Sequence, residues 1–166
     1  YGLDKKSVNN GFKISDLYSD TTVPVESAKW KTLPSVNLFQ SIYKAPIIIN
    51  MPTLKQHAST GFTCGLKNAM GLINNETRMK AHSLGIKNAI AEIASAVDPE
   101  LTIIDARSCL GRNHHLSLGG VLFNSNRLII SGDVVAADRV AATVLAESYD
   151  DFDERWACLL YTSDAA

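Results

Sequence analysis

Cysteine is scarce in this sequence, and its spacing excludes several kinds of site. Three cysteines occur among 166 residues, at positions 64, 109 and 158, and no two of them form a C-x-x-C pair. An odd number of widely spaced cysteines argues against a disulfide framework and against a complete zinc or iron–sulfur site. We interpret Cys64 as a small helix residue and not as a reactive thiol.

Long apolar runs and excess charge are also absent. No run approaches the roughly 20 apolar residues that cross a bilayer, and no signal peptide is recognisable. The formal net charge is −1, so no global field favours nucleic acid or an anionic membrane. We therefore expect no nucleic-acid partner and no membrane segment. Because the chain begins at Tyr1 without a methionine, we interpret it as part of a longer protein, and its localisation stays open between the cytoplasm and export.

Positive charge is concentrated in the middle of the chain. Residues 50–90 contain five Lys and Arg side chains against one acid, whereas residues 133–154 contain seven acids against one Arg. The length and the 46% of hydrophobic residues suffice for one ordinary core, so we expect a single domain. The central segment is the part of this domain that attracts anions.

The same central segment carries the densest polar chemistry. An apolar run at residues 47–49 is followed by a polar stretch, predicted as a loop, and then by a helical pattern at residues 64–72, which Thr60 or Thr63 can cap. In open α/β sheets, ligands bind beyond the carboxyl ends of strands, where a helix offers unpaired N–H groups to an anion. We therefore predict an anion site in this segment, with these substrate-binding candidates: Asn50, Thr60, Thr63 and Asn68.

The glycines of this segment do not form a nucleotide-binding loop. Three residues separate Gly61 from Gly65, and Leu66 precedes Lys67, whereas the Walker pattern needs four residues and then Lys-Ser/Thr directly after the second glycine. We do not predict nucleotide hydrolysis. Packing and the close approach of a ligand explain these glycines equally well.

The remaining pattern predicts an α/β fold with a mainly parallel core sheet and flanking helices. Apolar runs at residues 45–50 and 101–105 are typical of buried parallel strands, and an amphipathic helix from Ser83 to Val97 lies between them. This βαβ arrangement places Asp105, a further substrate-binding candidate, at the same sheet edge as Asn50. Other predicted elements are strands at 12–17 and 22–25, loops at 74–82 and 107–120, and a hairpin with arms at 121–123 and 128–130.

An alanine-rich helix is predicted at residues 134–147. Asp133 suits the positive end of its dipole, and Asp138 either lies on a solvated face or points at a partner. The side chains expected to be buried are Val135, Val140, Ala141, Val144 and Leu145.

Several segments resemble a known family. They are I-N-M-P-T-L-K-Q-H at residues 49–57, T-C-G-L-K-N-A-M-G at 63–71, Arg78 with His82, L-T-I-I-D at 101–105 and S-G-D-V-V-A-A-D-R-V at 131–140. In their order and spacing the chain is similar to the bacterial and archaeal family called domain of unknown function 362 (DUF362). The resemblance implies an α/β fold and no particular reaction.

The resemblance also implies how the chain is divided. The N-terminal part of the family domain is missing before Tyr1, so we assign residues 1–157 to a partial domain, truncated on its N-terminal side. Many relatives carry a ferredoxin-like 4Fe–4S module, which would lie elsewhere in the parent protein because this chain has no such cysteine ladder. Residues 158–166 resemble the translated adapter tail of environmental sequence fragments, and we expect them to be non-native.

The first functional hypothesis is an enzyme that acts on a small anionic substrate. Lys55 and Lys67 hold its carboxylate or phosphate, and His57 moves a proton, because imidazole titrates near neutrality. Asn68 donates a hydrogen bond to a developing oxyanion. These three residues, Lys55, His57 and Lys67, are the catalytic candidates.

The second hypothesis is a metal- or redox-associated module. Its candidate ligands are His57, His82, His114 and His115, together with Asp105, because imidazole and carboxylate suit zinc, iron or nickel. Since His–metal bonds are roughly 2.0–2.1 Å long, imidazoles more than about 8 Å apart cannot share one ion. A third interpretation is a non-catalytic scaffold domain.

Overall fold

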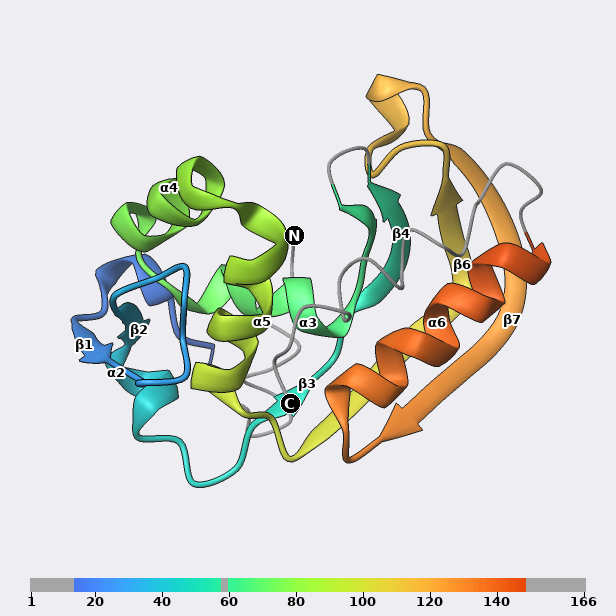
Figure 1. Ribbon diagram of the computed structural model, residues 1–166. Coiled ribbons are helices and arrows are strands. Elements are labelled where there is room, and N and C mark those ends of the chain that lie inside the picture. The colour runs from blue at the N-terminus through green and yellow to red at the C-terminus, as the bar shows by residue number, and fades with distance from the viewer. Residues whose placement is uncertain (1–13, 58–59, 149–166) are drawn as a thin grey trace.

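The main sheet is organised around its two longest strands. The computed structural model describes residues 14–57 and 60–148. In it, β6 (Leu101–Gly111) and β7 (Val121–Ser131) run antiparallel over eleven residues each (Figure 1). Along the other edge of β6, β3 (Ile49–Asn50) and β4 (Thr53–His57) pair parallel with it, and β5 (Gly61–Thr63) pairs antiparallel with β4. The predicted α/β fold is confirmed, with a mixed five-stranded sheet.

A small second sheet and the helices complete the fold. β1 (Thr22–Val25) pairs antiparallel with β2 (Val36–Phe39), and Pro24 lies on an edge strand as predicted. The helices are α2 (Gln40–Tyr43), α3 (Gly65–Asn68), α4 (Asn75–Leu84), α5 (Ile86–Val97) and α6 (Val134–Ser148), with 3₁₀ turns η1 (Leu17–Ser19), η2 (Ala69–Leu72) and η3 (Leu116–Leu118). In the described part of the chain, no helix combines the length and the apolar composition needed to cross a membrane.

Helix α6 covers one face of the main sheet and forms a hydrophobic core with it. Its buried side chains recur at helical spacing and pack against apolar residues of β4 to β7. The predicted burial is right for Ala141, Val144 and Leu145. It is wrong for Val135 and Val140, which are 43% and 50% exposed because they lie on the solvent side of the helix.

Helix α5 is the centre of a second core, between α3, α4 and β2. Its predicted apolar positions Ile90, Ile93 and Val97 are buried, and Asp98 ends it in the left-handed conformation. The helix begins only after Gly85, and not after Ser83 as predicted, because α4 occupies the preceding residues. The βαβ arrangement of β3, α5 and β6 is the predicted one.

The polar segment at residues 74–82, predicted as a loop, is mostly helix α4. Asn74 caps this helix, because its side chain accepts the N–H of the buried Thr77 at 2.9 Å. Arg78 donates to the carbonyl oxygens of Met70 and Ile73 in the preceding turn. A cap and contacts to a neighbouring turn stabilise this helix, and apolar periodicity does not reveal either.

Three strand predictions are also corrected. Residues 53–57 and 61–63, predicted as a loop, are the antiparallel strands β4 and β5. The hairpin predicted at 121–130 is the single strand β7, in which Asn126 has a positive φ beside a β-bulge. Of the strand predicted at 12–17, the described part is not a strand, since Asp16 caps η1. Residues 12 and 13, and the tail at 158–166 with Cys158, lie outside the described residues.

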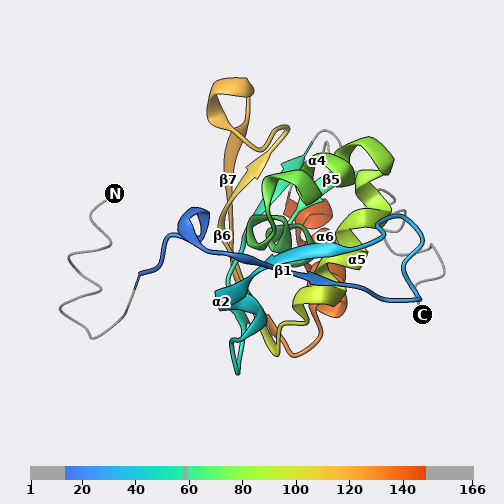
Figure 2. The same cartoon turned by 90° about the vertical axis from the view of Figure 1, so that its left-hand side faces the viewer.

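The second face of the β6–β7 pair carries apolar side chains that no described helix covers. Figure 2 shows α4, α5 and α6 on one side of this pair. Leu128 and Ile130 of β7 are 57% and 64% exposed, and Ile47 and Ile49 near β3 are 65% and 53% exposed. The prediction of a fully buried strand at residues 45–50 is therefore wrong, because only its last two residues join the sheet.

Glu92 of α5 fixes the segment that leads into β2. Its carboxylate accepts the N–H groups of Lys31, Thr32 and Leu33 at 2.7, 2.8 and 2.7 Å. We expect Glu92→Ala to lower the free energy of unfolding by about 2 kcal/mol, because three backbone donors lose a charged acceptor. Urea unfolding followed by circular dichroism measures this difference.

A matched control is Glu76→Ala. Glu76 pairs with the exposed Lys80 at 2.8 Å, and its loss is expected to cost less than about 0.5 kcal/mol. Equal costs for the two variants would show that Glu92 does not hold the segment.

Candidate functional site

The β4–β5 hairpin places three predicted site residues on one face. Lys55 and His57 are two residues apart on β4, so their side chains point to the same side of the strand. Leu54 points the other way, into the core under α6. Lys55 pairs with Thr63 of β5 across the strands, which brings the Thr63 side chain to the same face.

Lys67 of α3 completes a pair of lysines at this face. Its side chain is half-buried, and burial together with the nearby charge of Lys55 lowers its pKa from 10.5 to about 8. Among the described residues, no group forms a hydrogen bond or an ion pair with its ammonium group. The structure therefore brings the two predicted lysines close to each other, and no acid of the described residues forms an ion pair with Lys67.

His57 lies against these lysines and against a second histidine. Burial, and after it the positive charges of Lys67, His114, His82 and Lys55, together lower its pKa from 6.5 to about 4. Its ring stacks on the ring of His114, with 4.5 Å between the ring centroids. We call Lys55, His57, Lys67 and His114 the Lys–His cluster.

The loop at residues 112–120 holds His114 in this position. The Arg112 N–H donates to the side-chain carbonyl of Gln56, which ties the loop to β4 beside His57. The Nδ1 atom of His114 is buried and has no hydrogen-bond partner among the described residues. The stacked pair therefore depends on a contact between two segments that are far apart in the sequence.

The amino end of α3 is occupied by a carboxylate of the protein itself. The N–H groups of Gly65 and Leu66 donate to Asp138 of α6 at 2.6 and 3.0 Å. Asp138 is 2% exposed, so this cap is fully buried. The prediction that these N–H groups are offered to a ligand is therefore wrong, because an internal acid takes that place.

The predicted threonine cap of α3 is likewise replaced by Asp138. Thr60 is buried and donates its hydroxyl to the carbonyl of Phe62. A Cβ atom at Gly65 would come within 2.7 Å of Asp138 Oδ1 and 2.8 Å of Val134 Cγ2. Close packing against Asp138 and Val134 therefore explains why residue 65 is a glycine. Of the two roles predicted for Asp138, on a solvated face or pointing at a partner, the contact with α3 shows the second.

Asn50 and Asn68 meet each other on another side of α3. The Asn68 side-chain amide donates to Asn50 Oδ1 at 2.8 Å, and Asn50 Nδ2 donates to the Gly65 carbonyl at 2.9 Å. Both side chains line an apolar cavity of about 160 Å³ that does not include any residue of the Lys–His cluster. The predicted substrate-binding residues are thus divided between two places.

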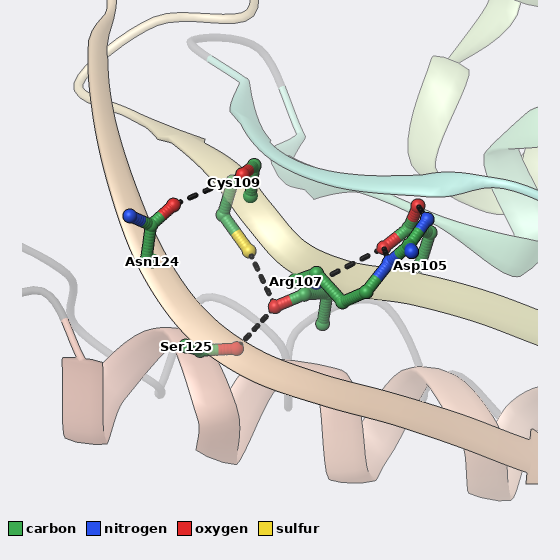
Figure 3. A network of polar contacts seen from close by, with 7 residues as sticks. Asp105, Arg107, Cys109, Asn124 and Ser125 are labelled. Atoms are coloured by element: carbon green, nitrogen blue, oxygen red, sulfur yellow. Dashed lines mark hydrogen bonds and ion pairs between the residues drawn. The ribbon is translucent and has the colours of Figure 1, made fainter.

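Asp105 belongs neither to the Lys–His cluster nor to the lining of the apolar cavity. It accepts two hydrogen bonds from the Arg107 guanidinium, at 3.0 and 2.8 Å, and these bonds hold its pKa at about 2 (Figure 3). Thr102, which pairs with Asn50, is buried on the α6 side of β6, and Asp105 lies three residues further along, on the opposite face. Asp105 and Asn50 are therefore not brought together.

The two described cysteines are both buried. Cys64 directly precedes α3, where burial and the Asp138 charge raise the pKa of its thiol well above the ordinary range. Cys109 donates to the Ala106 carbonyl, which also accepts the Ser125 hydroxyl (Figure 3). Both thiols are protonated at neutral pH, so neither is poised as a nucleophile.

The four histidines do not form a metal centre in the described part of the chain. His115 bonds the Ser117 hydroxyl through Nδ1 at 2.7 Å, and His82 is exposed on α4. No group of three or more His, Cys, Asp or Glu side chains there is arranged to hold a metal ion. The pair His57 and His114 is the part of the predicted histidine set that comes into contact.

Comparison with known sequences places the chain beside an uncharacterised family. Residues 1–143 match the family described as domain of unknown function (DUF362). Over 116 residues the chain is 28% identical to the thylakoid-associated protein sll1697 of Synechocystis sp. (strain ATCC 27184 / PCC 6803 / Kazusa). The match covers 66% of this chain and 36% of that protein, so the chain spans about a third of the relative's length.

Proposed function

Because this chain belongs to the DUF362 family, whose description names no reaction, we propose a function from its own side chains. The chain binds a small anion, a carboxylate or a phosphate, at the Lys–His cluster and acts on it as an enzyme. Lys55 and Lys67 hold the anion, and His57 accepts or returns a proton.

The burial and the lowered pKa of Lys67 are the main support for this proposal. A half-buried ammonium group without an acidic partner among the described residues is unfavourable, and its lowered pKa expresses that cost. A bound anion supplies the missing opposite charge. The Thr63 hydroxyl lies on the same face as Lys55 and is a suitable donor for a second oxygen of the anion.

His57 is suited to proton transfer once an anion is bound. With a pKa of about 4 it is neutral at pH 7, so its ring can accept a proton. After burial, the charge of Lys67 is the largest cause of the low pKa. An anion that neutralises Lys67 therefore raises the His57 pKa towards neutrality, where a general base is most effective.

Asn50, Thr60 and Asp105 receive no role at this cluster. Their polar side chains bond Asn68, the Phe62 carbonyl and Arg107 respectively. Asn68 is adjacent to Lys67 in sequence but lines the apolar cavity. We propose that Lys55, Lys67 and the Thr63 hydroxyl hold the anion beside the imidazole of His57.

Sulfate binding tests the proposal, because sulfate keeps its charge across the neutral and alkaline range. We expect saturable changes in the ¹H–¹⁵N amide spectrum at β4, β5 and α3. Lys55→Met is expected to weaken sulfate binding about tenfold, the effect of losing one charge contact of about 1.4 kcal/mol. Histidine C–H resonances should show the His57 pKa rising by about one unit or more at saturating sulfate.

The matched control is Lys80→Met, which removes an exposed lysine that pairs with Glu76 on α4. We expect it to leave sulfate affinity unchanged. An equal loss in Lys55→Met and Lys80→Met would contradict a specific site, and so would an unaltered His57 pKa at saturation.

A further inference from the structure

An apolar cavity lies beside α3. It measures about 160 Å³ and lies between β3, the α3–η2 segment and α5. Its walls include Ile48 of the segment before β3, Ala69 and Leu72 of η2, and Ala94 and Val97 of α5. An apolar cavity of roughly 150 Å³ is large enough to hold benzene.

The lining determines what kind of molecule fits. All thirteen residues that line the cavity are uncharged, and the polar side chains among them are Asn50 and Asn68. The Asn50 side chain is already hydrogen-bonded within the protein, because its Oδ1 accepts from the Asn68 amide and its Nδ2 donates to the Gly65 carbonyl. Asn68 Oδ1 receives no hydrogen bond from the described residues, so it remains as an acceptor.

The cavity is separate from the Lys–His cluster. Gly65, Asn68, Ala69 and Leu72 follow the helical spacing of three and four residues, so they line one side of the α3–η2 segment. Lys67 lines a different and much smaller void, of about 10 Å³, together with Thr60, Phe62 and Cys64. A ligand in the apolar cavity therefore does not occupy the position of the anion.

We infer that this cavity is a binding site for a small uncharged molecule with an apolar body of about six heavy atoms and one hydroxyl group. The body is held by the isoleucine, leucine, valine and alanine side chains, and the hydroxyl donates to Asn68 Oδ1. The site is independent of the proposed anion site.

Phenol is the probe, with benzene and benzoate as comparisons. In ¹H–¹⁵N spectra of the 166-residue chain, phenol should shift the amides of Gly65, Asn68, Ala69 and Val97 saturably, with a dissociation constant of about 1 mM or below. Benzene should bind about tenfold more weakly, because it lacks the hydroxyl. Benzoate should leave these amides unshifted, because no cation lines the cavity.

Two variants make the test specific. Ala94→Leu fills the cavity and should weaken phenol binding at least about tenfold, whereas Asn88→Leu adds the same side chain on the exposed side of α5 and should not. Asn68→Leu, at an exposed position, should reduce the affinity for phenol to that for benzene even if Ala94→Leu fails to fold. The inference is overturned if phenol produces no saturable shifts up to about 10 mM, or if the shifts lie on the outer face of β7.

Discussion

Replacing Asp138 by alanine is expected to lower the free energy of unfolding by about 3–5 kcal/mol. The Asp138 carboxylate accepts the N–H groups of Gly65 and Leu66 at 2.6 and 3.0 Å in a fully buried setting. Alanine leaves both donors without an acceptor and opens a gap under α3. Asp138 is 2% exposed, so we expect water to recover little of the desolvation cost of the two N–H groups.

Asp133→Ala is the matched control for this prediction. Asp133 caps α6 by accepting the N–H groups of Val135 and Ala136 at 2.8 and 3.0 Å, but it is exposed. Loss of an exposed cap costs about 1 kcal/mol, because water replaces the carboxylate. Urea unfolding of both variants gives the comparison. If Asp138→Ala costs no more than Asp133→Ala, the buried cap does not hold α3 against α6.

The second large effect is expected from Lys67→Met, which should reduce sulfate affinity at pH 7 about a hundredfold. The variant removes the half-buried charge that the anion neutralises. Its free energy of unfolding should fall by less than about 1 kcal/mol, because Lys67 forms no ion pair with the described residues and burial disfavours its charged form. A large loss of stability with unchanged sulfate affinity would identify Lys67 as a structural residue.

The pH dependence of sulfate binding distinguishes Lys67 from a general charge effect. The folded-state pKa of Lys67, about 8, lies below its ordinary value of 10.5, so the unfolded chain binds more protons between these values and stability rises with pH there. Sulfate restores the charged form, so binding takes up a proton above pH 8. Affinity should therefore fall about thirtyfold from pH 7 to 9.5.

Isothermal titration at several pH values measures this slope. The groups that influence Lys67 are Lys55, by its charge, and the neighbouring imidazole of His57, which is neutral over the whole range. In Lys67→Met the affinity should be nearly independent of pH. A wild-type affinity that does not change with pH, or a variant that keeps the slope, would contradict the assignment of Lys67.

Local sequence patterns were sufficient to predict those elements in which the buried residues recur at a regular spacing. The spacing of apolar residues in α5 and α6 predicts both helices within a few residues, because a helix must bury one stripe. The β-branched run at residues 101–105 predicts the start of β6. Alternation along a strand would also have placed Lys55 and His57 on one face, had the segment been recognised as a strand and not as a loop.

Prediction from the sequence failed for segments whose structure depends on contacts with residues elsewhere in the chain. Helix α4 has little apolar periodicity and depends on the Asn74 cap and the bonds of Arg78 to the preceding turn. The exposure of Ile47 and Ile49 depends on which elements cover that side of the sheet, and an apolar run alone does not reveal whether any element does. These are tertiary effects that override local preference.

By itself, the sequence determined the α/β class, the family, the two long amphipathic helices and the position of the lysine and histidine side chains within the central segment. Only the tertiary structure decided which of these groups meet. Asp138 lies 73 residues from Gly65 and yet takes the helix end that a ligand was predicted to use. His114 reaches His57 because β6 and β7 carry its loop to the β4–β5 hairpin. Contacts between distant segments arise from packing of the whole chain, and no local period encodes them.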